Sequence, residues 1–90
     1  MITYTMPQQG TLVGIVRHYF GKPHVAVIRF VNDVPMNTKV HFVGRNTDLT
    51  EKIDSMEYDH RPVIVAKSGE EIGIRVATKV HKGDRVYAAA

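Results

Sequence analysis

The sequence predicts a small all-β domain, and three observations support this fold class. Segments rich in β-branched and aromatic residues recur along the chain at short, even spacing. Clusters of glycine, proline, asparagine and aspartate separate these segments, as expected for tight turns. The chain has 90 residues, of which 43% are hydrophobic, and this suffices for one sheet system around one core. We therefore expect a six- to seven-stranded, mostly antiparallel sheet that forms a closed or partly open barrel.

The first two strands are expected to form a hairpin. Thr11–Phe20 is rich in β-branched and aromatic residues, and His24–Val31 has the same character. Gly21, Lys22 and Pro23 separate the two segments and suit a short turn. Both segments carry apolar residues at consecutive positions, whereas burial of one face alone produces stricter alternation. This pattern predicts either a tightly closed barrel or an outer face that binds a partner.

The middle of the chain contains one clear strand and one ambiguous segment. Lys39–Val43 alternates, with Val40 and Phe42 on the same face. In Leu49–Tyr58 the apolar residues have helical spacing, but the residues of this segment also suit a bent strand. Periodicity alone therefore leaves both structures open for this segment.

The last third of the chain contains three short β-rich segments separated by turns. Pro62 precedes the first segment and disfavours a helix at that point. Gly83 is free to take a positive φ in the final turn. The segments expected to be strands are Val63–Ala66, Glu71–Ala77 and Arg85–Ala88.

Residues 10–90 are expected to form a single domain, preceded by an N-terminal extension at residues 1–9. The start of the chain lacks the basic and apolar regions of a signal peptide. No apolar run approaches the ~20 residues needed to span a bilayer. The absence of cysteine excludes a disulfide framework and a thiolate metal site. Together these features predict a cytoplasmic protein.

Several short motifs follow one another in order along residues 10–88. They are Gly10-x-x-x-Gly14, Val40-x-Phe42-x-Gly44, Ala66-x-x-Gly69-x-x-Ile72-Gly73-Ile74 and Lys82-Gly83-Asp84. In this order they resemble the β-barrel second domain of elongation factor Tu, and still more a group of small stand-alone translation elongation factor-like proteins. Related barrels occur at the C-terminus of some collagenase-like peptidases. The resemblance implies a translation-factor-like β-barrel domain, and it favours strand over helix in Leu49–Tyr58.

The chain departs from the pattern of these proteins in three ways. Asn37-Thr38 stands where they usually have a Gly-Asp pair, although asparagine can also take a left-handed conformation. Glu70 and Glu71 make acidic a region that helps to hold the charged end of tRNA in elongation factor Tu. The Gly-x-x-x-x-Gly-Lys-Ser/Thr loop that binds nucleotide phosphates is absent, so GTP hydrolysis by that mechanism is excluded.

The sequence predicts neither a catalytic site nor a metal or cofactor site. Zinc requires several converging ligands, usually with a close pair in sequence, and the histidines lack such spacing. An acid–base pair could be built from Asp59 and His60 or from His81 and Asp84, but neighbours in a strand point to opposite faces. The five histidines are His18, His24, His41, His60 and His81.

The functional interpretation that we favour from the sequence is a non-catalytic binding module, with RNA or a ribonucleoprotein of translation as its partner. The net charge is +3, and basic residues with aromatic neighbours can hold phosphates while a ring stacks on a base. The alternative is that Tyr19 packs in the hairpin and that the cations only solubilise the surface. The candidate nucleic-acid-binding residues are Arg17, Tyr19, Lys22, Arg45, Arg75 and Lys79.

The second functional interpretation is a protein-interaction accessory domain for a separately encoded enzyme, such as a collagenase-like peptidase. Apolar residues on both faces of the first strands, and the run Val63–Val65, suit contact with another chain. Charge is also unevenly distributed, which predicts unlike faces on the folded protein. Five of the nine acids fall within twelve residues, at Asp48, Glu51, Asp54, Glu57 and Asp59.

Overall fold

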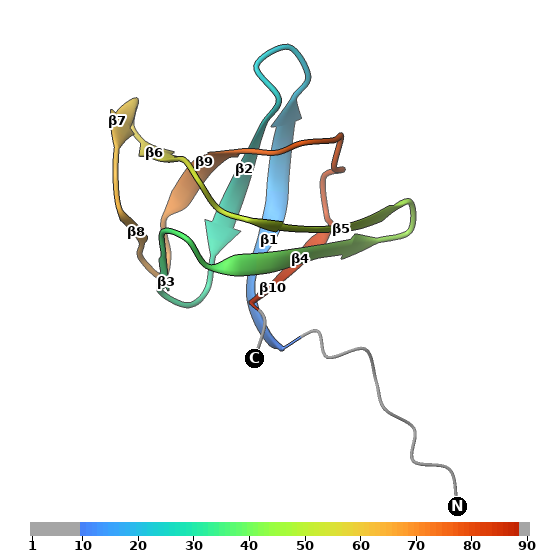
Figure 1. The fold of residues 1–90 in the computed structure, drawn as a ribbon, viewed down its shortest axis with the longest axis horizontal. Helices are drawn as coiled ribbons and strands as arrows, with labels where there is room; N and C mark the ends of the chain where they lie inside the picture. The colour runs from blue at the N-terminus through green and yellow to red at the C-terminus, as the bar shows by residue number, and fades with distance from the viewer. Residues whose placement is uncertain (1–9, 89–90) are drawn as a thin grey trace, which may run out of the picture.

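The computed structural model describes residues 10–88, which fold into ten short β-strands (Figure 1). The predicted N-terminal extension at residues 1–9 lies outside the described residues, and the domain boundaries at 10 and 90 stay predictions. The strands are β1 (Thr11–Phe20), β2 (Val25–Phe30), β3 (Val34–Pro35), β4 (Lys39–Gly44), β5 (Thr47–Lys52), β6 (Met56–Tyr58), β7 (Arg61–Pro62), β8 (Val65–Ala66), β9 (Glu71–Arg75) and β10 (Arg85–Ala88).

Eight of these strands form one antiparallel sheet in the order β5-β4-β10-β1-β2-β9-β6-β7, and β3 pairs separately with β8. In Figure 1, β4 and β5 run across the direction of β1 and β2, so the sheet is strongly bent. The strands at its two ends, β5 and β7, do not pair with each other within residues 10–88. The all-β, antiparallel prediction is therefore confirmed, whereas a closed barrel is not.

The number of strands exceeds the predicted six or seven because Leu49–Tyr58 is divided and because the short strands β3 and β7 form outside the predicted segments. The segment Leu49–Tyr58 contributes to both β5 and β6, and the buried residue Ile53 lies between them. The backbone N–H of Ile53 donates to Thr38 O, and the N–H of Asn37 donates to Ile53 O, each over 2.9 Å. Strand rather than helix is thus confirmed for this segment, with an interruption that its sequence does not reveal.

Two irregularities in β1 explain its consecutive apolar residues. The register of β1 against β10 shifts between Leu12 and Gly14, and its register against β2 shifts between Val16 and His18. Each β-bulge inserts a residue, so side chains on either side of it change faces. As a result Val13 and Val16 are both buried although they are three positions apart.

A single hydrophobic core lies inside the bend of the sheet. Val40 and Phe42 are fully buried, so their predicted common face is confirmed. Ile72, Ile74 and Val76 also point inward, from β9 and the residue that follows it. Burial of each such side chain contributes about 1.5–3 kcal/mol to folding. The remaining core residues are Val13, Val16, Ala26, Ile28, Phe30, Val34, Ile53, Met56, Ala66, Val80 and Val86.

The turns use left-handed backbone conformations where the sequence predicts them, and at further places. Asn37 has φ 71° and Gly83 has φ 92°, as expected from their types. The two-residue turn between β6 and β7 has φ 54° at Asp59 and 64° at His60. Positive φ at both central residues defines a type I′ hairpin turn, which favours Asn-Gly over the Asp-His present here. Within residues 10–88 no helix is long and apolar enough to cross a bilayer.

Candidate functional site: an apolar groove with an acidic rim

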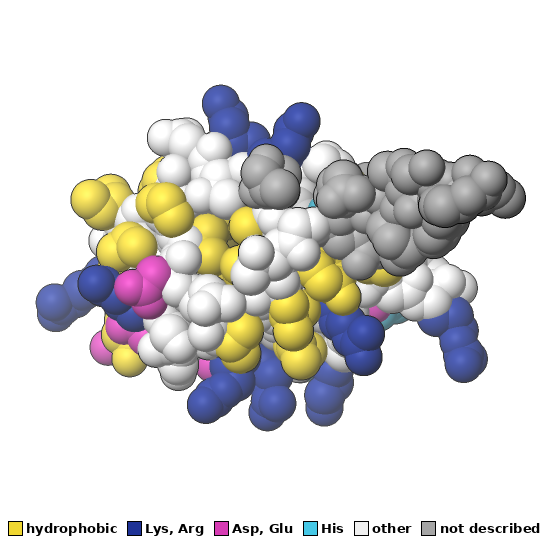
Figure 2. Space-filling model, turned by 90° about the horizontal axis from the view of Figure 1, so that it is seen from below, with side chains coloured by type: hydrophobic (Ala, Val, Ile, Leu, Met, Phe, Trp, Pro, Cys, Tyr) yellow, Lys and Arg dark blue, Asp and Glu magenta, His cyan; other side chains and the backbone are white. Residues whose placement is uncertain are grey.

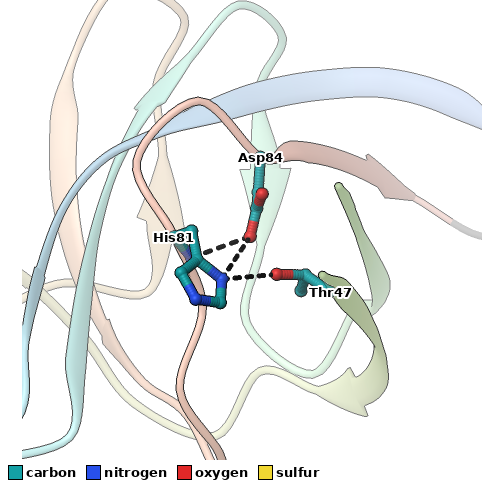
Figure 3. Close-up of polar contacts among 3 residues, drawn as sticks. All are labelled: Thr47, His81 and Asp84. Carbon is teal, nitrogen blue, oxygen red and sulfur yellow. Dashed lines mark hydrogen bonds and ion pairs between the residues drawn. The ribbon is translucent and has the colours of Figure 1, made fainter. Parts of the chain in front are cut away.

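His81 and Asp84 approach each other, but their geometry is that of a structural turn (Figure 3). The backbone N–H of His81 donates to Asp84 Oδ2 over 2.7 Å, whereas His81 Nδ1 lies 3.8 Å from the same oxygen. The imidazole Nδ1 instead shares a hydrogen bond of 2.9 Å with Thr47 Oγ1 from β5. Asp84 and Thr47 are both buried. The three residues therefore fasten the loop before β10 to the β4–β5 hairpin.

Gly44 makes room for this turn. A Cβ built on Gly44 would lie 1.9 Å from Asp84 Oδ1, so no other residue fits without displacing the carboxylate. The turn is also anchored to β1, because Val16 N donates to Asp84 O and Gly83 N donates to Val16 O, each over 2.8 Å. The motif that ends at Gly44 and the motif that ends at Asp84, about 40 positions later, therefore contact each other in the folded chain.

The histidines do not converge on a metal-binding arrangement in the described part of the chain. No group of three or more histidine, cysteine or acidic side chains within residues 10–88 could hold a metal ion. His41 Nε2 lies 2.6 Å from Asp48 Oδ1 across β4 and β5, and His24 Nδ1 lies 3.3 Å from the Tyr19 hydroxyl. These contacts join adjacent strands or the two ends of a hairpin.

The six candidate nucleic-acid-binding residues are spread over separate parts of the molecule. Lys22 lies in the β1–β2 turn and Arg45 in the β4–β5 turn, and these turns project in different directions in Figure 1. Tyr19 packs against the core from the inner face of β1, so it offers no exposed platform for a base. Arg17, Arg75 and Lys79 lie, respectively, in the bulge of β1, at the end of β9 and in the loop that follows it.

The charge around these cations also differs from that of a phosphate-binding surface. Arg17 Nε lies 3.6 Å from Glu71 Oε2, and Arg75 borders a hollow that also contains Glu51 and Asp54. Figure 2 shows Lys and Arg side chains projecting from several separate parts of the molecule's border in that view. The structure therefore does not assemble the predicted residues into one basic surface.

An apolar hollow lies on the outer face of the sheet, and we call it the β2–β9 groove. It has a volume of about 370 Å³ and lies between the β1–β2 and β6–β7 hairpins. Its floor is formed by Phe20, Val25, Val27 and Gly73, with Pro23 at one end. Phe20 is 47% exposed, and its ring lies beside that of His18, with 4.3 Å between the ring centroids.

The β2–β9 groove owes its depth to Gly73. Val27 pairs directly with Gly73 across the two strands, and Val25 lies two positions before Val27 on β2. A Cβ on Gly73 would lie 3.2 Å from Val25 Cγ1, inside the space that now forms the groove. Because Gly73 has no positive φ, what the glycine supplies here is space.

Acidic side chains form the rim of the groove. Glu57, Asp59 and Glu71 line it together with His60, and no lysine or arginine is among the lining residues. Within residues 10–88, Glu57 and Asp59 form no ion pair, and Glu71 meets only Arg17. The groove thus combines an apolar floor with three carboxylates on a chain whose net charge is +3.

Three acidic residues outside the rim have structural partners. Glu51 accepts two hydrogen bonds of 3.1 and 3.0 Å from the N–H of Ala77, through its two carboxylate oxygens. Glu70 accepts from the N–H of Lys67 at 3.0 Å, and Asp33 accepts from the N–H of Ser68 at 2.8 Å. In the rim, by contrast, Glu57 and Asp59 have no such partner among residues 10–88, and Glu71 has only the exposed pair with Arg17.

The sequence analysis identified the acidic residues of the rim but did not predict that they lie close together. Glu57 and Asp59 belong to one acidic cluster in the sequence, and Glu71 belongs to another. The structure joins them because β6 pairs with β9, with Glu57 opposite Gly73. The signal that could have located the groove is a glycine inside a strand, next to an acidic segment, since such a glycine often marks a close approach.

The fold and the groove define a small antiparallel β domain with a peptide-sized surface site. No protein-family model matches the chain. Over 76 residues it is 33% identical to an uncharacterized protease of Methanocaldococcus jannaschii. The match covers 83% of this chain but 19% of that protease, so the chain spans about a fifth of its length.

Solved structures show the same fold. A C-terminal domain from a Geobacillus thermoleovorans protein assigned to the U32 peptidases superimposes with a TM-score of 0.83, at 13% identity over 96% of this chain and 100% of that domain. The structure of its selenomethionine variant superimposes with a TM-score of 0.81, at 15% identity over 84% of this chain and 96% of that domain.

These comparisons correct the predicted resemblance to translation elongation factors. The related sequence is a protease, and the related structures are of the C-terminal domain of a protein assigned to the U32 peptidases, so none of the three is a translation factor. A translation factor and an RNA-binding role are not supported. The ordered glycine motifs misled because they specify bends and close contacts of the sheet, which proteins of different function can share.

Proposed function

We propose that this chain is a non-catalytic accessory domain that binds protein for a peptidase of the U32, collagenase-like kind. The observation that supports this most is the match to a segment comprising 19% of a protease, combined with the fold of a C-terminal domain from a U32 peptidase. A segment of this size leaves most of the protease to carry the chemistry. The cytoplasm remains the expected location, because the chain has no cysteine.

The described side chains fit a binding role better than a catalytic one. The His81–Asp84 pair is used to hold a turn, and Asp84 is buried beneath it. The β2–β9 groove presents apolar surface and unpaired carboxylates, which suit recognition of another chain. Such a domain raises the local concentration of substrate at a linked catalytic domain without taking part in bond cleavage.

The proposal is tested by replacing the matching segment of the Methanocaldococcus jannaschii protease with this chain. We expect the chimera to cleave gelatin with a KM about tenfold lower than a form that lacks the segment, because binding of the substrate is then bivalent. The kcat for a short fluorogenic peptide should be the same in both forms, which controls for folding of the catalytic part. This chain alone should not cleave either substrate.

Two results would overturn the proposal. One is cleavage of gelatin by the isolated chain, since it would place the catalytic groups within it. The other is a chimera with unaltered peptide cleavage whose KM for gelatin equals that of the form lacking the segment. In that case the domain would contribute nothing to the capture of substrate.

A further inference from the structure

We infer that the β2–β9 groove binds an extended protein segment in which a lysine or arginine lies next to an apolar side chain. The use of the groove for protein rests on the proposed accessory function, whereas the preference for cations follows from its lining. Phe20, Val25 and Val27 supply the apolar floor, and Gly73 leaves the space above β9 open. The side chain that fills this space must be apolar to match that floor.

The charge of the partner follows from the rim. Glu57 and Asp59 stand on one side of the groove without an ion pair among residues 10–88, and Glu71 contributes a third carboxylate. Their mutual repulsion is relieved when a cation enters, and each carboxylate then gains a charge-assisted hydrogen bond. The same rim repels phosphate, which excludes a nucleic acid as the occupant.

The backbone of the rim is held in a costly conformation. Asp59 and His60 both have positive φ, which costs of the order of 1 kcal/mol per residue in a side chain other than glycine. Asn-Gly would satisfy the same turn without this cost. Asp59 and His60 both line the groove, so we infer that a role in binding outweighs the conformational cost of this turn.

The partner's length and shape follow from the sheet. The lining residues of the two strands are Val25 and Val27 of β2 and Glu71 and Gly73 of β9. An extended chain rises about 3.3 Å per residue, so a segment of roughly three to four residues covers this length. Alternate side chains of the segment then face the sheet, and a basic residue next to an apolar one can reach the rim.

The inference is tested by selecting binders to the chain from a displayed library of random heptapeptides. We expect enrichment of peptides that place lysine or arginine beside leucine, isoleucine, valine or proline. A synthetic peptide of the enriched sequence should bind at least about tenfold more weakly to Glu57→Gln/Glu71→Gln, because a desolvated charge pair is lost. It should also bind more weakly to Gly73→Leu, which fills the groove.

Lys67→Gln and Arg45→Gln serve as controls, since both lie outside the groove and should bind the peptide as the unaltered chain does. Backbone amide spectra establish that each variant is folded. The inference is overturned if the enriched peptides are acidic or uncharged, if no sequence is enriched, or if folded groove variants bind unchanged. Peptide selection uses the isolated chain, so its failure is distinct from failure of the chimera to capture gelatin.

Discussion

Gly44 and Gly73 both lie in strands and both lack a positive φ, yet the space that each provides is used differently. At Gly44 the chain's own carboxylate occupies the space, because Asp84 Oδ1 would lie 1.9 Å from an added Cβ. At Gly73 the nearest atom is Val25 Cγ1, 3.2 Å from an added Cβ, and the remaining space is an open groove. One glycine therefore serves folding, and the other creates a surface for a partner.

The two glycines differ in the polar groups that surround them. Around Gly44 the polar atoms are satisfied internally, by backbone N–H groups and the Thr47 and His81 side chains. Around Gly73 the polar groups are carboxylates without internal partners, except for Glu71 with Arg17. A buried site with satisfied polar groups favours rigidity, whereas exposed apolar surface beside unpaired charge favours binding.

The largest expected effect is the loss of stability in Gly44→Ala. The added methyl displaces the Asp84 carboxylate from the N–H of His81, and a buried group that loses its hydrogen bond costs about 1–3 kcal/mol. For a domain of this size the midpoint of thermal unfolding should fall by roughly 4–8 °C for each kcal/mol. Thermal unfolding followed by circular dichroism measures this change.

Gly73→Ala is the matched control for that variant. Val25 Cγ1 can move by a few tenths of an ångström, and alanine is favoured over glycine in a strand by about 0.5–1 kcal/mol. We expect this variant to be as stable as the unaltered chain or slightly more stable. Equal destabilisation by both substitutions would contradict the distinction drawn between the two glycines.

An intermediate effect is expected for the double change Asp59→Asn/His60→Gly in the β6–β7 turn. Asn-Gly suits a type I′ turn, so the free energy of unfolding should rise by about 1 kcal/mol. The same change removes a carboxylate from the rim, so the selected basic peptide should bind more weakly. Urea denaturation and fluorescence anisotropy measure the two quantities, and a gain in stability with unchanged binding would exclude Asp59 from the site.

The smallest expected effect is that of Arg17→Ala. The Arg17–Glu71 pair is largely exposed, so the free energy of unfolding should change by less than about 0.5 kcal/mol. Removal of the guanidinium leaves Glu71 free for a ligand, and binding of a basic peptide should strengthen by about two- to threefold. Titration by fluorescence anisotropy at low salt measures the change. Weaker binding of the basic peptide would contradict the role assigned to the acidic rim.

The sequence was sufficient for much of the fold because local patterns fix it. Strict alternation placed Val40 and Phe42 in the core, and the residue types at Asn37 and Gly83 anticipated their positive φ values. The same reasoning failed in β1, where two bulges break the alternation. Bulges depend on how neighbouring strands pair, so a single strand does not reveal them.

The candidate site was predicted less well because it depends on contacts between distant segments. Basic residues such as Lys22 and Arg45 attracted attention as isolated charges, but the turns that carry them point in different directions. Phe20 lay next to the residues chosen from β1, and its place on the groove floor depends on the face that the second bulge gives it. Adjacency in sequence was therefore a poor guide to a shared surface.

By itself, the sequence determined that this protein is an all-β domain with antiparallel strands, tight turns and one hydrophobic core. These properties follow from side-chain alternation and turn chemistry, which act within a few residues. The tertiary structure alone decided that Asp84 fills the space at Gly44 and that Glu57 and Glu71 flank the space at Gly73. The reason is that strand order and register set those neighbours, and both are properties of the whole sheet.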